Sequence, residues 1–315
     1  MNSAKVDLST TLAGVPLANP VLNASGTWDL EGEQLLGEPK PGTIVTKTIK
    51  LKPVAGNPTP RIHDTGRLVV LNSIGLAGIG IDAFLADELP QLKALNRRVV
   101  VNISGTTVAE YVELAERLND SGADIIEANL GCPNVDKHML YGQNPDLTFE
   151  LVSTIRPRIT VPLAVKLTPN VTDIVAIAKA AQAGGANILS LINTLLGMDI
   201  NPQTGQPYLG NIFGGMSGPA ISFLALRCVW QVCHCPDISI PVIGMGGITT
   251  AQDALKFFWA GAQAVAVGTA NFTCPTDAMP NIISGISDFL AERGFSSFEE
   301  WRKQEVLPRF PELEK

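Results

Sequence analysis

One cysteine stands between two amides in residues 127–134, Glu-Ala-Asn-Leu-Gly-Cys-Pro-Asn. The cysteine is Cys132, and the amides are Asn129 and Asn134. A partly exposed thiol can transfer a proton or act as a nucleophile. Amide side chains donate and accept hydrogen bonds, which suits a ligand with both kinds of group, such as a pyrimidine ring. The segment therefore predicts a catalytic cysteine beside a small polar ring. A buried thiol next to a turn proline is the alternative.

Two glycine-rich turns predict a phosphate site. Gly246 and Gly247 follow one apolar run, and Gly268 and Thr269 follow the next. Glycine lets a ligand approach the backbone closely, and backbone N–H groups at the start of a helix bind phosphate. Each turn alone would be an ordinary connection between two elements. Together, after the last two strands of a barrel, they favour a bound phosphate.

Two lysines stand at the ends of apolar runs, Lys47 in Val-Thr-Lys-Thr and Lys166 in Ala-Val-Lys-Leu-Thr. Lysine is rarely buried without a partner, so we expect each ammonium group to meet an anion or water. Ordinary surface lysines are the alternative. Small polar residues also gather in three loops, which contain Asn72-Ser73 before Gly75, Asn193-Thr194, and residues 214–219. We expect these loops to converge on one cleft.

The elements that must position these residues repeat in one order. A short apolar run is followed by a turn and then by a segment with helical spacing. The runs are nearly continuous, as in parallel strands that are covered on both faces. The predicted strands are 20–24, 43–46, 98–103, 124–130, 162–168, 187–192, 240–245 and 263–267. The predicted helices are 30–36, 83–95, 108–119, 147–159, 172–183, 220–232 and 250–260. This α/β pattern predicts a (β/α)8 TIM barrel.

Three insertions interrupt this order. Residues 50–71 contain several prolines and a Val-Val-Leu run, which predict a small β-hairpin. Residues 131–146 and 197–219 form long loops after two of the strands. Long loops in a compact domain are usually functional, and barrel enzymes hold their active sites at the carboxyl ends of the strands. No linker or repeat divides the chain, so we expect residues 1–315 to form a single domain.

The composition excludes several classes of protein. Charged residues make up 17% of the chain and apolar residues 45%, so the chain is not a disordered polyelectrolyte. The formal net charge of −7 disfavours nucleic-acid binding. No apolar stretch is long enough for a membrane span, and residues 1–7 contain no apolar signal region. The five cysteines do not form a disulfide framework in a chain of this size, so we expect a reduced, cytoplasmic enzyme.

Three smaller expectations follow from the same sequence. The low charge content and a mean hydropathy of +0.20 favour a buried interface, and we expect a homodimer. Cys228, Cys233, His234 and Cys235 lack the paired spacing of zinc and ferredoxin sites, so we expect no metal there. His63 and His138 are expected to face solvent.

The motifs together resemble those of the dihydroorotate dehydrogenases along nearly the whole chain. The matching segments are 23–26, 46–48, 71–76, 132–134, 166–169, 193–194, 215–219 and 244–247. Cysteine rather than serine at position 132 resembles class 1, the soluble cytoplasmic enzymes. Residues 193–198 and 268–272 resemble the 1B subgroup. Its members pair an FMN subunit with a second polypeptide, which carries FAD and an iron–sulfur cluster and delivers electrons to NAD⁺.

The resemblance implies oxidation of (S)-dihydroorotate to orotate in pyrimidine biosynthesis. Cys132 would be the base that removes the C5 proton, and the hydride of C6 would pass to N5 of FMN. The implied substrate-binding residues are Lys47, Asn72, Ser73, Gly75, Leu76, Asn129, Asn134, Asn193 and Thr194. The implied FMN-binding residues are Ala24, Ser25, Gly26, Lys47, Thr48, Asn102, Asn129, Lys166, Ile192, Gly218, Gly246, Gly247, Gly268 and Thr269.

Two lysines have more specific implied roles. Lys47 would lie near the substrate carboxylate, and Lys166 near the N1–O2 edge of the flavin, where negative charge develops on reduction. The flavin would supply the redox chemistry, and the protein would supply orientation and charge. A partner subunit with FAD and an iron–sulfur cluster would complete a heterotetramer.

The chain departs from the family pattern in the loop that contains Cys132. Gly131 stands where the family usually has serine, and residues 136–139, Asp-Lys-His-Met, replace a glycine-rich stretch of the 1B subgroup. This loop is expected to exclude water once substrate binds. We therefore expect the departures to affect loop motion and partner contacts more than the reaction.

Four alternatives remain open. A 1A-type enzyme would pass electrons directly to fumarate, and a dihydropyrimidine dehydrogenase subunit also uses a cysteine near FMN. A tRNA-dihydrouridine synthase shares the Asn-x-Gly-Cys-Pro string of residues 129–133 but needs a basic face for RNA, and this chain is acidic. A non-enzymatic scaffold would be colourless, whereas an FMN enzyme is yellow.

Overall fold

Eight parallel strands close into a barrel in the structure, a computed structural model that describes residues 6–66, 68–131 and 139–309. Around the barrel the strands follow the order β10-β13-β14-β3-β4-β7-β8-β9. They are β3 Val21–Asn23, β4 Thr43–Val45, β7 Arg98–Ile103, β8 Ile125–Asn129, β9 Leu163–Leu167, β10 Ile188–Leu191, β13 Val242–Met245 and β14 Ala264–Val267. Every predicted strand is confirmed within two residues at each end, and so is the (β/α)8 TIM barrel.

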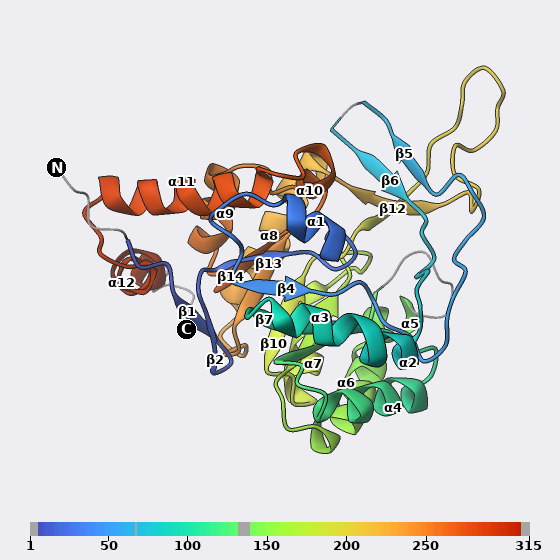
Figure 1. The fold of residues 1–315 in the computed structure, drawn as a ribbon, viewed down its shortest axis with the longest axis horizontal. Helices are drawn as coiled ribbons and strands as arrows, with labels where there is room; N and C mark the ends of the chain where they lie inside the picture. Colours follow the sequence, from blue (N-terminus) through green and yellow to red (C-terminus); the bar gives the residue numbers. More distant parts are fainter. Residues whose placement is uncertain (1–5, 67, 132–138, 310–315) are drawn as a thin grey trace.

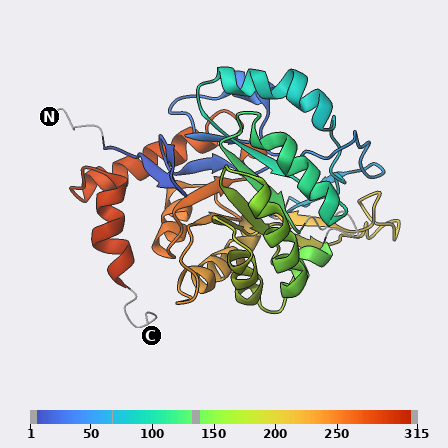
Figure 2. The ribbon, with the colours of Figure 1, turned by 90° about the horizontal axis from the view of Figure 1, so that it is seen from below.

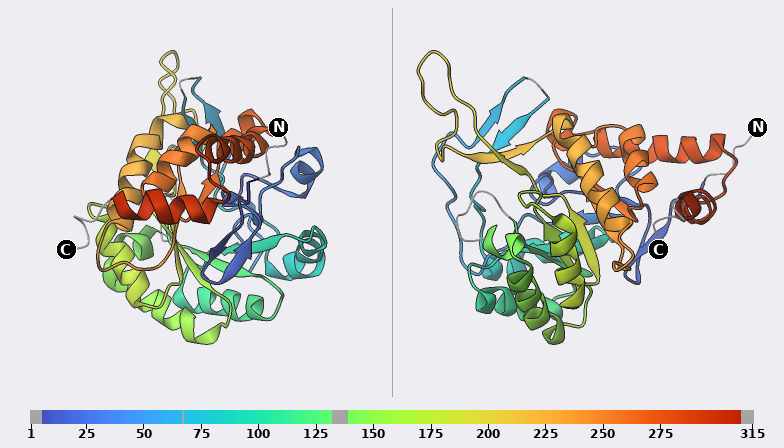
Figure 3. Two further views of the ribbon diagram at one scale, coloured as in Figure 1. Left: turned by 90° about the vertical axis from the view of Figure 1, so that its left-hand side faces the viewer. Right: turned by 180° about the vertical axis from the view of Figure 1, so that it is seen from behind.

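Helices connect the strands and surround the barrel, as Figure 1 and the left view of Figure 3 show. They are α1 Leu30–Leu35, α2 Ile81–Ala83, the π-helical turn η1 Phe84–Glu88, α3 Leu89–Ala94, α4 Val108–Asn119, α5 Met139–Gln143, α6 Pro145–Ile155, α7 Ile174–Ala183, α8 Ser222–Cys233, α9 Ala251–Trp259, α10 Ala270–Thr273 and α11 Ala278–Glu292. The predicted helices are confirmed. Among the described residues, no helix has the length and apolar character that a bilayer crossing requires.

Polar residues fix the starts of these helices. Thr107 caps α4 by accepting a hydrogen bond from the backbone N–H of Glu110, and Asp173 caps α7. Thr250 and Asp253 form a reciprocal capping box at the start of α9. Such caps satisfy backbone N–H groups that have no partner inside the helix. These caps therefore fix the points near the carboxyl end of the barrel at which α4, α7 and α9 begin.

The interior of the barrel changes in polarity along its axis. Successive side chains of a strand point to opposite sides, so every second residue faces inward. The inner apolar cluster includes Val100 of β7, Ile125 of β8, Ala164 of β9 and Ile188 of β10. Two residues further toward the carboxyl end, the same faces carry Asn102, Glu127, Lys166 and Ser190, all buried. The barrel is therefore apolar at its amino end and polar at its carboxyl end.

An additional hairpin, absent from the predicted elements, closes the amino end of the barrel. Strands β1 Thr10–Leu12 and β2 Val15–Leu17 pair antiparallel around Ala13 and Gly14, both of which have positive φ. Leu12 and Leu17 are 0% and 2% exposed and belong to the inner apolar cluster. Full burial of a leucine contributes about 1.5–3 kcal/mol, so the hairpin stabilises this end as an apolar plug.

Two insertions combine into a second sheet beyond the carboxyl ends of the strands. It consists of β5 Ile62–Asp64, β6 Val70–Asn72, β11 Leu195–Gly197 and β12 Gly214–Ser217, in the order β11-β12-β6-β5. The predicted hairpin within residues 50–71 is therefore confirmed. It pairs with the insertion that follows β10, on the right of Figures 1 and 2. The sheet covers one side of the barrel opening.

The expectation that His63 faces solvent is wrong. Its side chain is 19% exposed, and its ring stacks on that of Tyr208 with centroids 3.9 Å apart. His63 Nε2 also lies 3.0 Å from Asp199 Oδ2. Asp199 and Tyr208 belong to the loop between β11 and β12, so this contact joins the two insertions. His138 lies outside the described residues.

The last described helices pack at the amino end, opposite the second sheet (Figure 1). They are α12 Phe298–Trp301, the π-helical turn η4 Arg302–Val306 and the 3-10 turn η5 Leu307–Arg309. Trp301 is fully buried among aromatic rings that include those of Phe258 and Phe289. Asp7 forms a parallel bridge with Ser297 beside them. The early and late parts of the chain therefore meet at this end.

Candidate active site at the carboxyl end

The carboxyl end of the barrel gathers the described residues that the sequence predicts for the site. Most lie at or just beyond the carboxyl end of a barrel strand, and parallel strands all end at the same rim. The others lie at the ends of β6 and β12 in the second sheet, which covers one side of that rim. Ala24, Ser25 and Gly26 follow β3, Lys47 and Thr48 follow β4, Asn102 and Asn129 lie near the ends of β7 and β8, and Lys166 lies in β9. Asn72 ends β6, Ser73 to Leu76 follow it, Ile192 to Thr194 follow β10, Gly218 follows β12, and Gly246, Gly247, Gly268 and Thr269 follow β13 and β14.

Lys166 is a buried cation in this cleft. Its side chain is 5% exposed, and its Nζ donates a hydrogen bond to Ser25 Oγ, 3.1 Å away across the barrel. Within the described ranges, no carboxylate oxygen lies within 4.0 Å of this ammonium group. Burying an unpaired charge is costly, so Lys166 fits a site for a group that carries or develops negative charge.

Two predicted amides contact each other at the rim. Asn193 Nδ2 donates to Asn129 Oδ1 at 3.0 Å, and the Asn129 carbonyl accepts from the buried Tyr111 hydroxyl at 2.7 Å. The carbonyl of Thr194 accepts from Asn170 Nδ2 at 3.0 Å. These bonds hold the amides in fixed orientations, as recognition of a polar ring requires. Asn170 therefore supports the site, although no motif in the sequence marks it.

Glu127 lies one inward position below Asn129. It is 3% exposed; its Oε2 accepts from Asn102 Nδ2 at 2.5 Å and its Oε1 from Ser190 Oγ at 2.6 Å. The carboxyl group therefore determines which end of the Asn102 amide faces it. Glu127 and Ser190 were not among the predicted site residues. The signal was present, because a carboxylate inside the apolar run 125–129 needs partners within the barrel.

Two buried polar atoms test whether FMN fits this cleft. Asn102 Oδ1 and Ser73 Oγ have no hydrogen-bond partner within the part of the chain that the structure describes. An unsatisfied buried polar group costs about 1–3 kcal/mol, so each atom suits a ligand group. A flavin ring offers an N–H donor and a carbonyl edge that becomes negative on reduction. Together with the Lys166 ammonium, the residues present fit FMN.

The turn after β13 requires glycine at two positions. Gly246 and Gly247 have φ values of +129° and +74°. A Cβ on Gly246 would lie 2.6 Å from Ala225 Cβ, and one on Gly247 would lie 2.7 Å from Ser222 Cβ. Helix α8 therefore packs directly on this turn. The arrangement leaves backbone rather than side chains at the predicted phosphate site, and it lies next to the turn after β14 because these strands are paired.

The second sheet is bonded to this phosphate-site region. Thr269 Oγ1 donates to Ser217 Oγ at 2.9 Å, and Ser217 Oγ donates to the carbonyl of Val70 at 3.2 Å. Gly218 has a φ of +104°, and a Cβ there would lie 2.5 Å from the carbonyl oxygen of Leu68. The hydrogen bonds fix β6 and β12 relative to the end of β14. Ser73 is thereby held near the predicted flavin site.

Lys47 is exposed at the rim, whereas Thr48 next to it is buried. Burial raises the pKa of the nearby Glu88 carboxyl, and the positive charge of Lys47 acts in the opposite direction. The Lys47 ammonium group is therefore exposed to water and interacts with the partly buried Glu88 carboxyl, as expected for a lysine that must meet an anion or water. Its exposed position suits contact with a substrate carboxylate.

Cys132 and Asn134 lie outside the described residues, so their predicted roles stay predictions. Both ends of their loop are described, because Gly131 follows β8 and helix α5 begins at Met139. A Cβ on Gly131 would clash with the Thr168 side chain. In this chain, glycine at position 131 therefore leaves room for the Thr168 side chain.

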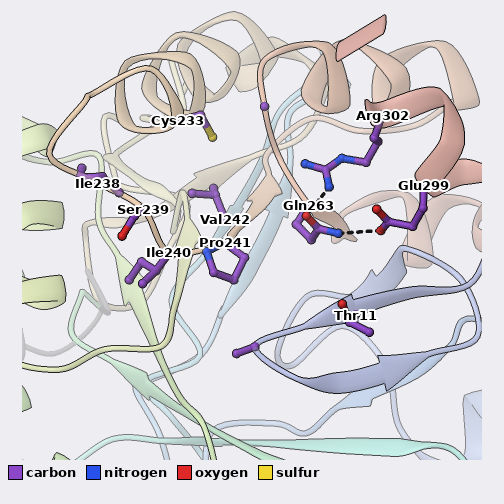
Figure 4. Close-up of a pocket in the computed structure, with 12 residues that line it drawn as sticks. Thr11, Cys233, Ile238, Ser239, Ile240, Pro241, Val242, Gln263, Glu299 and Arg302 are labelled. Atoms are coloured by element: carbon purple, nitrogen blue, oxygen red, sulfur yellow. Dashed lines mark hydrogen bonds between the residues drawn. The ribbon is translucent and has the colours of Figure 1, made fainter. Parts of the chain in front are cut away.

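No metal site is found: the described residues contain no cluster of three metal-binding side chains. Burial raises the pKa of the Cys233 thiol to about 12, so this cysteine is a neutral packing residue. A cavity of about 440 Å³ that includes Cys233 lies at the amino end, next to the β1–β2 hairpin (Figure 4). It is separate from the candidate active site.

Comparison with known proteins agrees with this geometry. A family model described as dihydroorotate dehydrogenase matches residues 7–290. The catalytic subunit of dihydroorotate dehydrogenase B (NAD(+)) from Geotalea daltonii is 48% identical over 302 residues, covering 94% of this chain and 97% of that protein. The proteins of the same name from Alkaliphilus oremlandii and Geobacter sulfurreducens are 45% and 46% identical, covering 93% and 94% of this chain and 97% of each relative. The chain therefore belongs to the dihydroorotate dehydrogenase family.

Proposed function

We propose that this chain oxidises (S)-dihydroorotate to orotate in pyrimidine biosynthesis, as the FMN-binding catalytic subunit of an NAD-linked, 1B-type enzyme. Residues 1–315 would act as one FMN-binding domain. The observation that carries the proposal is the buried Lys166 ammonium, which faces a polar cleft without a carboxylate partner in the described ranges. Relatives named for this activity match more than nine-tenths of the chain.

The reaction removes two hydrogens from neighbouring carbons of the substrate. Cys132 would accept the proton from C5, which is general-base catalysis. Bound FMN would supply the redox chemistry by accepting the C6 hydride at N5. Lys166 would lie at the flavin edge where negative charge develops, and its burial would strengthen that electrostatic stabilisation. The proton would thus pass to Cys132 and the hydride to the bound flavin.

Substrate and cofactor would be held by different groups of residues. Lys47 would bind the substrate carboxylate, and Asn72, Asn129, Asn134, Asn193 and Thr194 would hydrogen-bond the ring and carboxylate, with Ser73, Gly75 and Leu76 lining the same site. Asn102 would accept from the flavin ring through its Oδ1, supported by Glu127. The turns with Gly246, Gly247, Gly268 and Thr269 would bind the phosphate.

The chain would work in the cytoplasm as a homodimer that binds an FAD- and iron–sulfur-containing subunit, giving a heterotetramer that reduces NAD⁺. The relatives are named as catalytic subunits of an NAD(+) enzyme, which supports a partner. Large apolar side chains are also exposed on the second sheet and its loop, namely Leu196, Met198, Ile200, Ile212 and Phe213. A concentrated set of exposed apolar residues is typical of an interface.

An anaerobic titration tests the proposed reaction. The purified chain should be yellow, and dihydroorotate should bleach its flavin absorbance in a 1:1 ratio while releasing orotate. Dihydrouracil, which lacks the carboxylate, should leave the absorbance unchanged. Bleaching by dihydrouracil alone would instead identify a dihydropyrimidine dehydrogenase subunit. Co-purification with an FAD-containing chain and reduction of NAD⁺ would support the 1B assignment, and direct turnover with fumarate would contradict it.

A further inference from the structure

The amino end of the barrel contains a cavity that the proposed reaction does not use. Its volume is about 440 Å³, within the range of about 300–1,000 Å³ common for small-molecule sites. Figure 4 shows its lining: the β1–β2 hairpin on one side, residues 238–242 at the start of β13 on another, and the C-terminal helices on a third. Val242 begins β13, whereas Gly246 follows it, so the cavity and the active site lie at opposite ends of that strand.

Arg302 is a buried cation that lines this cavity. Its side chain is 6% exposed, and Figure 4 shows its guanidinium group directed into the space between the lining residues. One terminal nitrogen, Nη1, donates to Gln263 Oε1, whereas the buried Nε has no partner among residues 6–66, 68–131 and 139–309. Over the same residues, no carboxylate oxygen lies within 4.0 Å of the guanidinium.

Glu299 also lines the cavity, but its carboxyl group is engaged elsewhere. Gln263 Nε2 donates to Glu299 Oε1 at 2.9 Å, and the Thr10 hydroxyl donates to the same oxygen. The Gln263 amide thus lies between the two charges, with its oxygen toward Arg302 and its nitrogen toward Glu299 (Figure 4). Glu299 attracts the guanidinium from beyond ion-pair distance and does not satisfy its N–H groups.

The rest of the lining supplies no further charge. Ile238, Ile240, Pro241 and Val242 form an apolar wall, and Ser239 and Thr11 add hydroxyl groups. The Cys233 thiol is neutral because burial raises its pKa to about 12. Burial also lowers the pKa of the Arg302 guanidinium, the expected response of a cation with incomplete compensation. Arg302 begins the π-helical turn η4, a rare conformation that recurs at functional sites.

We propose that this cavity binds a small organic oxyanion, with its carboxylate or phosphate group on Arg302 and its apolar body against the Ile238–Val242 wall. The planar guanidinium presents parallel N–H donors that match both kinds of oxyanion. Lys166 at the opposite end has the same two properties, burial and the lack of a carboxylate partner in the described ranges. This inference does not depend on the proposed reaction.

Binding is measured on the FMN-loaded chain by isothermal titration calorimetry at constant ionic strength. Benzoate and phenyl phosphate are the probes, because both place an oxyanion on an apolar ring, and they distinguish a carboxylate site from a phosphate site. Benzyl alcohol is the uncharged control. We expect saturable binding of one or both anions at one site per chain and no binding of the alcohol. Lack of saturable binding by either anion would overturn the proposal.

Two substitutions locate the bound anion. Arg302→Met should weaken binding by about tenfold or more, because it removes charge-assisted hydrogen bonds. Ser239→Glu introduces a carboxylate into the cavity wall at an exposed position, so it should abolish binding without lowering the unfolding midpoint. Ser239→Gln is the matched control of similar size, and it should bind as the unmodified chain does.

The outcomes are decisive even where Arg302→Met does not fold, because Ser239→Glu then tests the site alone. Binding that survives Ser239→Glu, or that is lost equally in Ser239→Gln, would overturn the assignment. Dihydroorotate oxidation should be equal in both Ser239 variants, since the cavity and the active site lie at opposite ends of the barrel. A failure of the proposed function would therefore leave this result unaffected.

Discussion

The two ends of the barrel each contain one buried cation, Lys166 at the carboxyl end and Arg302 at the amino end. Their environments have different origins. Lys166 belongs to β9 and shares the interior with Glu127 on the adjacent strand β8 and Asn102 on β7, the next strand beyond it, in the same inward-facing pattern. Arg302 comes from a helix after the barrel and donates to Gln263, whose amide in turn donates to Thr10 of the β1–β2 hairpin. The carboxyl ends of the strands and the second sheet therefore build one site. The loops before β13 and β14, the β1–β2 hairpin and the C-terminal helices build the other.

We expect the carboxyl end to determine turnover and the apolar plug at the amino end to determine the free energy of unfolding. At the carboxyl end, the buried polar residues disfavour folding unless they bind a ligand or one another. At the amino end, Leu12 and Leu17 close the barrel with apolar contacts. Substitutions at the first end should therefore change turnover, and substitutions of the plug should change the free energy of unfolding. Three substitutions test this division and a fourth tests a helix cap outside the cleft, from the largest expected effect to the smallest.

Replacing Cys132 with alanine should lower turnover of dihydroorotate by about 10³-fold, because a general base contributes roughly 10²–10⁴-fold. The variant should still bind FMN in a 1:1 ratio, measured by its absorbance. Cys274→Ala is the control, since Cys274 is a free, exposed cysteine to which the proposed reaction assigns no role. Near-normal turnover in Cys132→Ala would refute the proposed base.

Replacing Lys166 with methionine should lower turnover by about 10²-fold, the scale of losing one preorganised electrostatic contact. The midpoint potential of the bound flavin should also fall, because the cation favours the reduced, negatively charged form. Spectroelectrochemical titration measures this potential. Lys179→Met is the control, because Lys179 forms an exposed ion pair with Asp237. An unchanged potential in Lys166→Met would mean that Lys166 does not face the flavin.

Replacing Leu12 with alanine should lower the free energy of unfolding by about 2–5 kcal/mol, the usual cost of truncating a buried leucine. Urea denaturation measures the loss, and Thr11→Ala on the exposed side of the same strand should cost little. Turnover per bound FMN should stay unchanged in both variants. If Leu12→Ala lost turnover but kept its free energy of unfolding, the amino end would contribute to the reaction, which contradicts the proposed division.

Asp253→Asn should have the smallest effect, about 1 kcal/mol at neutral pH, because the capping carboxylate is close to solvent. Burial acts to raise the pKa of the Asp253 carboxyl, but hydrogen bonds from Lys256, Thr250 and Thr249 hold that pKa below its ordinary value. A depressed pKa in the folded state stabilises the protein above the unfolded pKa, and this contribution is lost as pH falls through the folded value. The variant should lose less stability than the unmodified chain when urea denaturation is repeated from pH 5 downward.

The sequence predicts the barrel well because its strands repeat one pattern. Each buried strand is a nearly continuous apolar run with a glycine, asparagine or lysine within two residues of its carboxyl end, and these residues mark both the strand end and the cleft. Lys166 shows this most clearly, since its strand and its position within the cleft both follow from Ala-Val-Lys-Leu-Thr. The hairpin within residues 50–71 was predicted from the same kind of local signal.

The parts that could not be predicted depend on contacts between distant segments. The β1–β2 hairpin has strands of only three residues, and its burial depends on the barrel above it. The His63 ring stacks on that of Tyr208, which lies in a different insertion. Arg302 contacts Gln263 across 39 positions of sequence, and no periodic pattern indicates that contact. Glu127 is the intermediate case, because its strand was predicted but its bond to Asn102 required the register of β7 and β8.

The closing of the amino end also constrains how the chain matures on the ribosome. Thr10 bonds to Glu299, 289 positions later, and Phe298 N donates to the carbonyl of Asp7 at 2.8 Å. At a synthesis rate of about 5–20 residues per second, roughly 15–60 s separate the emergence of these partners. During that interval the nascent hairpin lacks its final neighbours. The amino end of the barrel is therefore completed only after residues 298 and 299 have been synthesised.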